Sequence, residues 1–204
     1  NDMTKGNPLK IFIYFTIPLL IGNIFQQLYS MVDTIIVGRF VGVNALAALG
    51  ACNSLFFLVN GLVLGLTSGF AVLVAQKFGA QDEKGVKKAV ASNITLTIVL
   101  TVIITIVALL AVKPLLNMMN TPENIYEDAR VYITLIYAGI ITQTGYNMAA
   151  GILRALGDSK TPLYFLIVAS ILNVILDLIF IINFNMGVAG AAYATIISQA
   201  VSAI

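Results

Sequence analysis

The sequence is poor in the residues that most enzymes and soluble domains depend on. It has no histidine, no tryptophan and one cysteine, Cys52, and only 10% of its residues are charged. The absence of histidine excludes His-based catalysis, histidine proton relays and most zinc sites. A single cysteine excludes a disulfide within the chain, and any aromatic belt at a membrane surface has to consist of Tyr and Phe.

Apolar residues are abundant instead. They make up 59% of the 204 residues, and the mean hydropathy is +0.98, whereas about a quarter of the residues of a soluble domain are charged. We therefore expect an all-α integral membrane protein, because a helix satisfies its own backbone hydrogen bonds in lipid. The net charge is only +2, and membrane topology explains the basic residues better than a nucleic-acid partner does.

Hydropathy predicts six transmembrane helices joined by short polar connections. The last apolar stretch is shorter than a full span of about 20 residues with its flank. We therefore expect the chain to be truncated at or in its sixth helix and to be one half of a longer protein. The expected helices are approximately 11–37, 48–76, 90–112, 126–153, 163–182 and 188–204.

The basic residues are distributed unevenly between the two sides of these spans. Eight of the eleven Lys and Arg residues lie in 1–10, 77–88 or 154–162, which fall on one side. The positive-inside rule makes that side cytoplasmic. The prediction is a multi-pass protein of the plasma membrane with a cytoplasmic N-terminus, and no Lys or Arg is expected deep in any span.

Two acidic residues lie inside predicted spans, where a carboxylate costs about 2.5–3.5 kcal/mol on insertion scales. Asp33 ends a polar stripe of the first span, and Asp177 lies in the fifth, one turn after Asn173. The pair is either structural or a cation or proton site, and the rarity of such acids favours the second. Two neighbouring carboxylates cannot both ionise easily at low dielectric. An all-oxygen site for Na⁺ or a proton would consist of Asp33, Asn173, Asp177 and Thr195.

A second polar group shares helix faces with this pair. Gln26 and Tyr29 lie on the same stripe as Asp33, and Gln143 and Asn147 are one turn apart in the fourth span. Substrate contact and hydrogen bonding between helices are about equally expected for each of them. The candidate cavity residues are Gln26, Tyr29, Gln143, Tyr146 and Asn147.

Glycines recur at every fourth position of the second span, at Gly61, Gly65 and Gly69. Small residues at this spacing let helix backbones approach closely in lipid, so we expect a packing contact rather than a site. The third span has no polar residue beyond threonine in 94–112. It is expected to face lipid and to be structural.

Several short motifs occur in a particular order along the chain. They are Pro18, Tyr29-Ser-Met-Val-Asp33 with Gly38, Gly42-x-x-Ala45-Leu-Ala, Gly151-Ile-Leu-Arg-Ala-Leu-Gly-Asp158, Asn173-x-x-x-Asp177, and Gly187-Val-x-Gly190-Ala-Ala with Thr195. In this order, and over essentially all of the chain, they resemble the N-terminal lobe of a prokaryotic MATE (multidrug and toxic compound extrusion) transporter.

The resemblance implies one lobe of a twelve-helix antiporter that exports amphiphilic, often cationic, drugs and other toxic organic compounds against Na⁺ or H⁺ entry. It implies that Asp33, Asn173, Asp177 and Thr195 bind the coupling ion, which is the only cofactor expected. It also implies cavity contacts for Gln26, Tyr29 and Asn147 and a bend of the first helix at Pro18. The second six-helix lobe, which alternating access requires, is not part of this chain, so its partners would be that lobe, membrane lipid and small organic substrates.

Two other functions remain as alternatives. A flippase for lipid-linked precursors, from the same superfamily, would share the helix pattern but usually has more basic residues in its cavity. A non-transporting structural membrane protein would have no need for two deep acids. An enzyme is not predicted, because the sequence has no HExxH or DDxxD motif and no Ser-His dyad.

Overall fold

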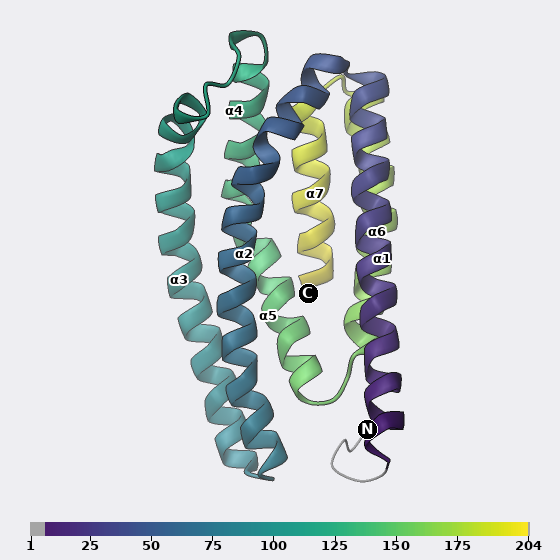
Figure 1. Cartoon of the computed structure of the whole chain (residues 1–204), viewed down its shortest axis with the longest axis vertical. Helices are drawn as coiled ribbons and strands as arrows, with labels where there is room; N and C mark the ends of the chain where they lie inside the picture. The colour runs from purple at the N-terminus through teal and green to yellow at the C-terminus, as the bar shows by residue number, and fades with distance from the viewer. Residues whose placement is uncertain (1–6, 204) are drawn as a thin grey trace.

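The computed structural model describes residues 7–203, and that part of the chain is helical almost throughout. The helices run side by side along one long axis (Figure 1). The expected all-α class is therefore confirmed. In chain order the elements are α1 (Pro8–Phe40), α2 (Val43–Gly79), α3 (Glu83–Met118), α4 (Glu123–Ala138), α5 (Ile140–Ala155), α6 (Lys160–Leu178), the π-helical η1 (Ile179–Asn183) and α7 (Gly187–Ala203).

Four helical segments within residues 7–203 are long and apolar enough to cross a membrane. They coincide with the first, second, third and fifth expected spans, although α2 and α3 extend beyond the apolar runs on which the expectation rested. The longest, α2, has 37 residues, which corresponds to about 55 Å. The fourth and sixth expected spans do not form helices of this kind, so a count of six is not confirmed.

The expected fourth span, 126–153, is divided at Gly139 into α4 and α5. The N–H of Gly139 donates to the carbonyl of Leu135 at 3.0 Å, and its carbonyl accepts from the N–H of Thr142 at 3.1 Å and from the Thr142 hydroxyl at 2.8 Å. The side chain of Ile196 in α7 fills the space beside it, so that an added Cβ would lie 2.4 Å from Ile196 Cγ1. The prediction of one continuous helix is wrong here, because Gly139 is a poor helix former that admits a neighbouring side chain.

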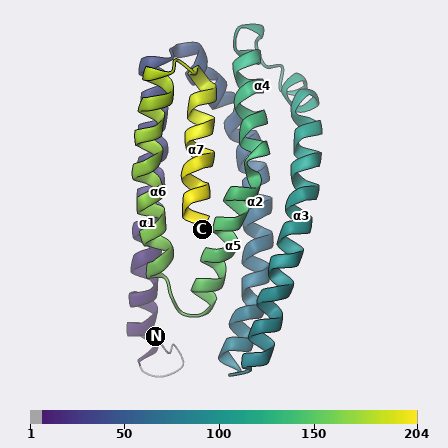
Figure 2. The same ribbon diagram turned by 180° about the vertical axis from the view of Figure 1, so that it is seen from behind.

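The helices pack in two groups that α7 connects. α1 packs mainly against α6, and α6 against α7, whereas α2 packs against α3, α4 and α5; α7 also contacts α4 and α5. Figures 1 and 2 show α1 with α6 on one side of the molecule and α2 with α3 on the other. The larger core lies between α2, α3 and α4, where the buried hydroxyl of Tyr137 donates to the carbonyl of Leu55 at 3.0 Å.

The outer faces are apolar, as expected for helices in lipid. α3 exposes Ile98, Val102, Ile106 and Leu110, and the last of these is 75% exposed. Its buried side carries Thr97 and Thr101. The lipid-facing role expected for the third span agrees with this arrangement.

The glycines of α2 do not mediate the packing expected of them. A Cβ added at Gly61, Gly65 or Gly69 would have no neighbouring atom within 4 Å, and all three residues are exposed. The expectation of a close helix contact at these positions is wrong within the described part of the lobe. The four-residue spacing places the glycines on one face, but this face points away from the other helices.

Connections at one end of the lobe carry most of the basic residues. The start of α1, the α2–α3 turn and the α5–α6 connection all lie at the same end (Figure 1). Lys5, which also contributed to the predicted orientation, lies outside the described residues. The basic connections therefore lie together at one end of the lobe, as the predicted orientation assumes.

The α5–α6 connection has a defined backbone structure. The N–H of Gly157 donates to the carbonyl of Arg154 at 3.0 Å, and the N–H of Asp158 donates to that of Leu153 at 2.9 Å. This is a Schellman ending, which requires the positive φ of +86° that Gly157 adopts. The connection therefore fixes the backbone of Arg154 in the last turn of α5.

Asp158 then holds the first turn of α6. Its carboxylate accepts from the N–H groups of Lys160 and Thr161, both at 3.0 Å, and from the Thr161 hydroxyl. These hydrogen bonds, that of the Thr161 hydroxyl first, lower the pKa of Asp158 below its ordinary value of 3.8. The carboxylate is thus fully engaged within its own loop.

Candidate functional site

α1 and α6 bring the two membrane acids together. The carboxyl groups of Asp33 and Asp177 lie within hydrogen-bonding reach of one another. Asp177 is fully buried, with 0% exposure. Neither oxygen of Asp177 receives a hydrogen bond from a donor, and Oδ1 of Asp33 receives none either. Burying charged oxygens without partners is costly, and a bound proton or cation would offset that cost.

Asn173 and Thr195 lie beside the acids. The Nδ2 group of Asn173 donates to the Thr195 hydroxyl at 3.4 Å, which is a long and weak hydrogen bond. The amide oxygen of Asn173 is buried and has no donor. The structure thus pairs Asp33 of α1 with Asp177 of α6, and Asn173 of α6 with Thr195 of α7. Asn173 lies one helical turn before Asp177, which links the two pairs.

The donor set consists of oxygen atoms. Within residues 7–203 there is no group of three or more His, Cys, Asp and Glu that could hold a metal ion. Two carboxylates with an amide and a hydroxyl oxygen suit a proton or a hard cation such as Na⁺, and they do not suit the softer transition metals. That these residues bind the coupling ion stays a prediction.

A π-helical segment, η1, directly follows the helix that carries Asp177. Gly190 of α7 packs against it, so that a Cβ added to Gly190 would lie 3.1 Å from Cβ of Phe180. π-Helical turns inside membrane helices often accompany functional sites. The run of apolar residues in 178–183 contains no signal from which this turn could be predicted.

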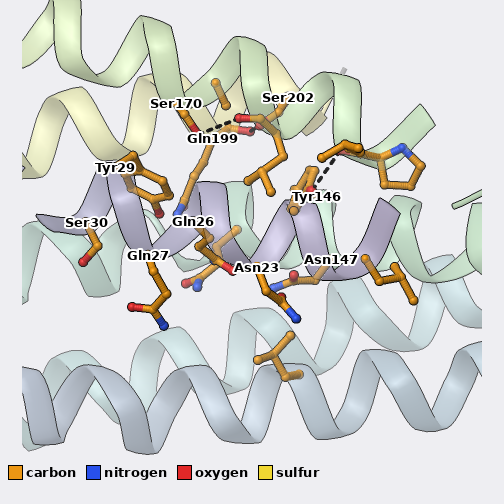
Figure 3. Close-up of a pocket in the computed structure, with 18 of the residues that line it drawn as sticks. Asn23, Gln26, Gln27, Tyr29, Ser30, Tyr146, Asn147, Ser170, Gln199 and Ser202 are labelled. Atoms are coloured by element: carbon orange, nitrogen blue, oxygen red, sulfur yellow. Dashed lines mark hydrogen bonds between the residues drawn. The ribbon is translucent and has the colours of Figure 1, made fainter. Parts of the chain in front are cut away.

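A cavity of about 630 Å³ lies beside the acid pair. Its volume falls within the range of about 300–1,000 Å³ that is usual for sites of drug-sized ligands. The wall comes from α1, α2, α5, α6 and α7, and Figure 3 shows Tyr146 and Asn147 of α5 close to the polar stripe of α1. Asn173 lies on this wall as well as beside the acids.

The five residues predicted to line a cavity all lie on this wall. They are Gln26, Tyr29, Gln143, Tyr146 and Asn147. Two of them also bond to other helices or loops: Gln143 Nε2 donates to Asn60 Oδ1 at 2.6 Å, and the Tyr146 hydroxyl donates to the carbonyl of Pro162 at 3.2 Å. Gln143 and Tyr146 thus show the structural role, one of the two left open for this group, and contact with a substrate stays a prediction for all five.

Pro18 is buried on the cavity wall. α1 continues through it without interruption (Figure 1). Pro18 cannot donate a backbone hydrogen bond, so the helix is weaker at this point. A bend that depends on the bound ion stays a prediction.

Sequence reasoning missed several residues of the wall. The most important is Arg154, which lies just beyond the expected fourth span, in the last turn of α5, and lines the cavity. It follows Asn147 by seven residues and Gln143 by eleven, which places it on the same face of α5. That spacing was a usable signal, but Arg154 was assigned to a loop. The wall residues that were also missed include four amides, Asn23, Gln27, Asn60 and Gln199.

Comparison with known proteins agrees with the sequence motifs. The MatE family model matches residues 18–179. The probable multidrug resistance protein YpnP of Bacillus subtilis is 35% identical over 201 residues, which cover 98% of this chain and 45% of YpnP. The probable multidrug resistance protein NorM of Thermotoga maritima is 30% identical over 203 residues, which cover 95% of this chain and 42% of NorM.

Solved structures give the same result. A structure described as the outward-facing conformation of a multidrug resistance MATE family transporter of the MOP superfamily has a TM-score of 0.91 and 34% identity. The match covers 97% of this chain and 44% of that chain. The present chain thus spans less than half the length of these relatives. The region matched by the family model includes both membrane acids and most of the cavity wall, and the chain belongs to the MATE family of multidrug transporters, which are not enzymes.

Proposed function

We propose that this chain is the N-terminal lobe of an antiporter that exports amphiphilic organic compounds in exchange for Na⁺ or H⁺ entry. The observation that carries the proposal is the pair of Asp33 and Asp177, three of whose four carboxyl oxygens are buried without a hydrogen-bond donor, next to a cavity of drug size. A proton or Na⁺ would supply the missing partner. The multidrug-resistance relatives support export of organic compounds.

An ion can drive export only if it binds two conformations with different affinity. Asp33 and Asp177 belong to α1 and α6, so an ion between them draws these helices together. α1 also carries Gln26 and Tyr29 on the cavity wall. Bending of α1 at Pro18 on ion binding would therefore change the cavity and release the compound.

The complete transporter requires a second lobe. The relatives are more than twice as long as this chain, and rocking of one lobe against the other gives alternating access. In this proposal α4 and α5 together form the fourth span and α7 contributes the sixth. The lobe would lie in the plasma membrane, in contact with lipid, with its basic connections on the cytoplasmic side.

The test is ion-driven efflux by the full-length transporter carrying Asp177→Asn or Asp33→Asn. Each change keeps the shape of the side chain and removes its charge. We expect efflux of fluorescent amphiphiles to fall by about tenfold or more, which corresponds to a loss of about 1.4 kcal/mol of coupling. Glu123→Gln, at the exposed start of α4, removes an acid outside the membrane core and should have no effect. Unchanged efflux in both Asp variants would exclude the proposal.

Calorimetry then identifies the ion. Na⁺ binding that strengthens as the pH rises, and that is lost in Asp177→Asn, would indicate that Na⁺ and protons compete for one site. Absence of Na⁺ binding at every pH, together with retained proton-driven efflux, would assign the coupling to H⁺. Loss of both would contradict ion coupling through this lobe.

A flippase for lipid-linked precursors is the second candidate, and the observation in its favour is Arg154 on the cavity wall. It ranks below export because a single basic residue is fewer than such a cavity usually contains. The ion-dependent efflux assay separates the two functions.

A further inference from the structure

A second, much smaller cavity lies between α2, α3 and α5. Its volume is about 10 Å³, and one water molecule needs about 10–15 Å³. It shares no lining residue with the larger cavity beside the acid pair. Aliphatic side chains form much of its wall, but four threonines also line it, and none of them is more than 5% exposed. They are Thr67 of α2, Thr97 and Thr101 of α3, and Thr144 of α5.

The hydroxyl of Thr97 has no hydrogen-bond partner among residues 7–203, and its oxygen is buried. A threonine within a helix commonly donates to the carbonyl four residues earlier, as Thr95 of the same helix does to Ala91 at 3.0 Å. Thr97 makes no such bond. The outer side of α3 is apolar, so a helix in lipid offers this hydroxyl no bulk water. Because an unsatisfied buried hydroxyl is costly, Thr97 indicates a bound partner in the cavity that it lines.

Thr97 belongs to a polar stripe on the inner face of α3. Asn93, Thr97 and Thr101 follow one another at intervals of four residues, and all three are buried. Asn93 reaches α2 directly, because its Nδ2 donates to the carbonyl of Phe70 at 2.9 Å. The side chain of threonine is shorter than that of asparagine. One turn further along, a small bridging molecule is therefore needed to make the same kind of connection.

The hydroxyls of Thr67 and Thr144 complement that of Thr97. Thr67 donates to the carbonyl of Val63 at 2.9 Å, and Thr144 donates to that of Ile140 at 2.8 Å. Because each hydroxyl has used its proton, its oxygen can only accept a further hydrogen bond. Thr97 still has a proton to donate. A water molecule both donates and accepts, so it can satisfy hydroxyls of both kinds at once.

We propose that one buried water molecule binds in this cavity, where it accepts from the Thr97 hydroxyl and donates to those of Thr67 and Thr144. Thr101 is its fourth partner, which agrees with the two to four polar partners that a buried water usually has. The water links α3 to α2 and α5 within the membrane interior. A set of hydroxyls without a carboxylate suits water and not a cation, because an unpaired charge at this depth is costly. The site does not depend on the transport function proposed above.

The test is the melting temperature of the full-length transporter in detergent with Thr97→Val, which keeps the shape of the side chain and removes the hydroxyl. If the hydroxyl holds a water, its loss leaves the water without a donor, and we expect the melting temperature to fall by about 2–4 °C. If the hydroxyl has no partner, valine removes an unsatisfied polar atom and the melting temperature rises. A rise would overturn the proposal.

Thr95→Val is the matched control, because it makes the same change on the exposed side of the same helix, at a hydroxyl that is already bonded to the backbone. It should not lower the melting temperature. Thr101→Val should lower it, and the double variant of Thr97 and Thr101 should melt close to the less stable single variant, since both changes remove the same water. Additive shifts would overturn the proposal.

Two further measurements identify the occupant. The difference in melting temperature between Thr97→Val and the unmodified protein should be the same in sodium chloride and in choline chloride. A difference that requires Na⁺ would assign the cavity to a cation and overturn the proposal. A crystal structure of the full-length protein that resolves ordered waters should show one within hydrogen-bonding distance of Thr97 Oγ1, and none there in Thr97→Val. Absence of this water from the unmodified protein would also overturn the proposal.

Discussion

Unsatisfied oxygen atoms are concentrated at one point of the lobe. Among residues 7–203, five buried side-chain polar atoms have no hydrogen-bond partner, and four of them belong to Asp33, Asn173 and Asp177. Each such atom costs about 1–3 kcal/mol if nothing satisfies it. A cluster of this kind is a strong reason to look for a bound proton or ion at the position where α1, α6 and α7 meet.

Asp158 gives the lobe a pH-dependent contribution to stability outside the membrane core. The Thr161 hydroxyl and backbone N–H groups lower its pKa from 3.8. A group whose pKa is lowered on folding stabilises the protein above its unfolded-state pKa, and this contribution is lost as the pH falls through the folded-state pKa. We expect Asp158→Asn to lower the melting temperature at neutral pH and the difference to decline only as the pH falls below 3.8, the ordinary pKa. Thermal unfolding in detergent at several pH values measures it.

The size of this effect is modest, because Asp158 lies in a solvated connection; we expect less than about 1 kcal/mol. Thr161→Val removes the strongest of the hydrogen bonds and should reduce the pH-dependent part without removing it. An equal loss of stability at every pH would show that Asp158 acts through the shape of the loop and not through its charge.

The candidate site was largely predictable at the level of residue types. Acids, amides and tyrosines are rare within apolar runs, so each one stands out, and the helical repeat places them on shared faces. Arg154 was missed for the opposite reason. At the end of α5 a basic residue looks like an ordinary loop charge. Its spacing from Asn147 places it on the same helix face, but the cavity wall in the structure shows that this face reaches as far as Arg154.

At the scale of elements, the contact between α5 and α7 depends on the absence of a side chain at Gly139. A Cβ there would lie 2.4 Å from Ile196 Cγ1. We expect Gly139→Val to destabilise the lobe by about 1–3 kcal/mol, as overpacking of a well-packed core usually does. The melting temperature of the purified protein in detergent provides the measurement.

The matched control is Gly65→Ala in α2, where an added Cβ meets no atom within 4 Å. Alanine is the better helix former by about 1 kcal/mol, so this variant should be as stable as the unmodified protein or more stable. If Gly139→Val melted at the same temperature as Gly65→Ala, the contact with Ile196 would not be the reason for the glycine.

Long apolar runs in the sequence predicted where the helices lie, but they did not predict where the helices are interrupted. The break at Gly139 depends on Ile196, which is distant in sequence and cannot be inferred from local propensity. The glycines of α2 had the spacing of a packing motif and nevertheless face outward. A periodic pattern shows which residues share a helix face, but it does not show what that face contacts. The π-helical η1 lies in close contact with Gly190 of α7, which is also not inferable from local sequence.

At the scale of the whole molecule, the proposed orientation can be measured on a single helix. α3 joins the two ends of the lobe (Figure 1), with Lys84 near its start and Asn117 near its end, both exposed. We expect a membrane-impermeant maleimide to label Asn117→Cys in intact cells and Lys84→Cys only after permeabilisation. This follows from the basic connections being cytoplasmic.

The native Cys52 is fully buried, at 0% exposure, and the unmodified protein should therefore remain unlabelled as the control. The reverse pattern would place the N-terminus outside the cell. Labelling of both positions in intact cells would mean that α3 does not cross the membrane.

Asn173 lines the cavity and also donates a hydrogen bond to Thr195, another residue of the proposed ion site. In the proposed ion site its one amide oxygen would be a ligand, and a compound that drew this oxygen into the cavity would remove it from the ion. Thermodynamic reciprocity then applies: the factor by which the ion weakens binding of the compound equals the factor by which the compound weakens binding of the ion. If both proposed sites are occupied in this way, Asn173 alone would couple them, and no chain of intervening residues would be needed to carry the signal.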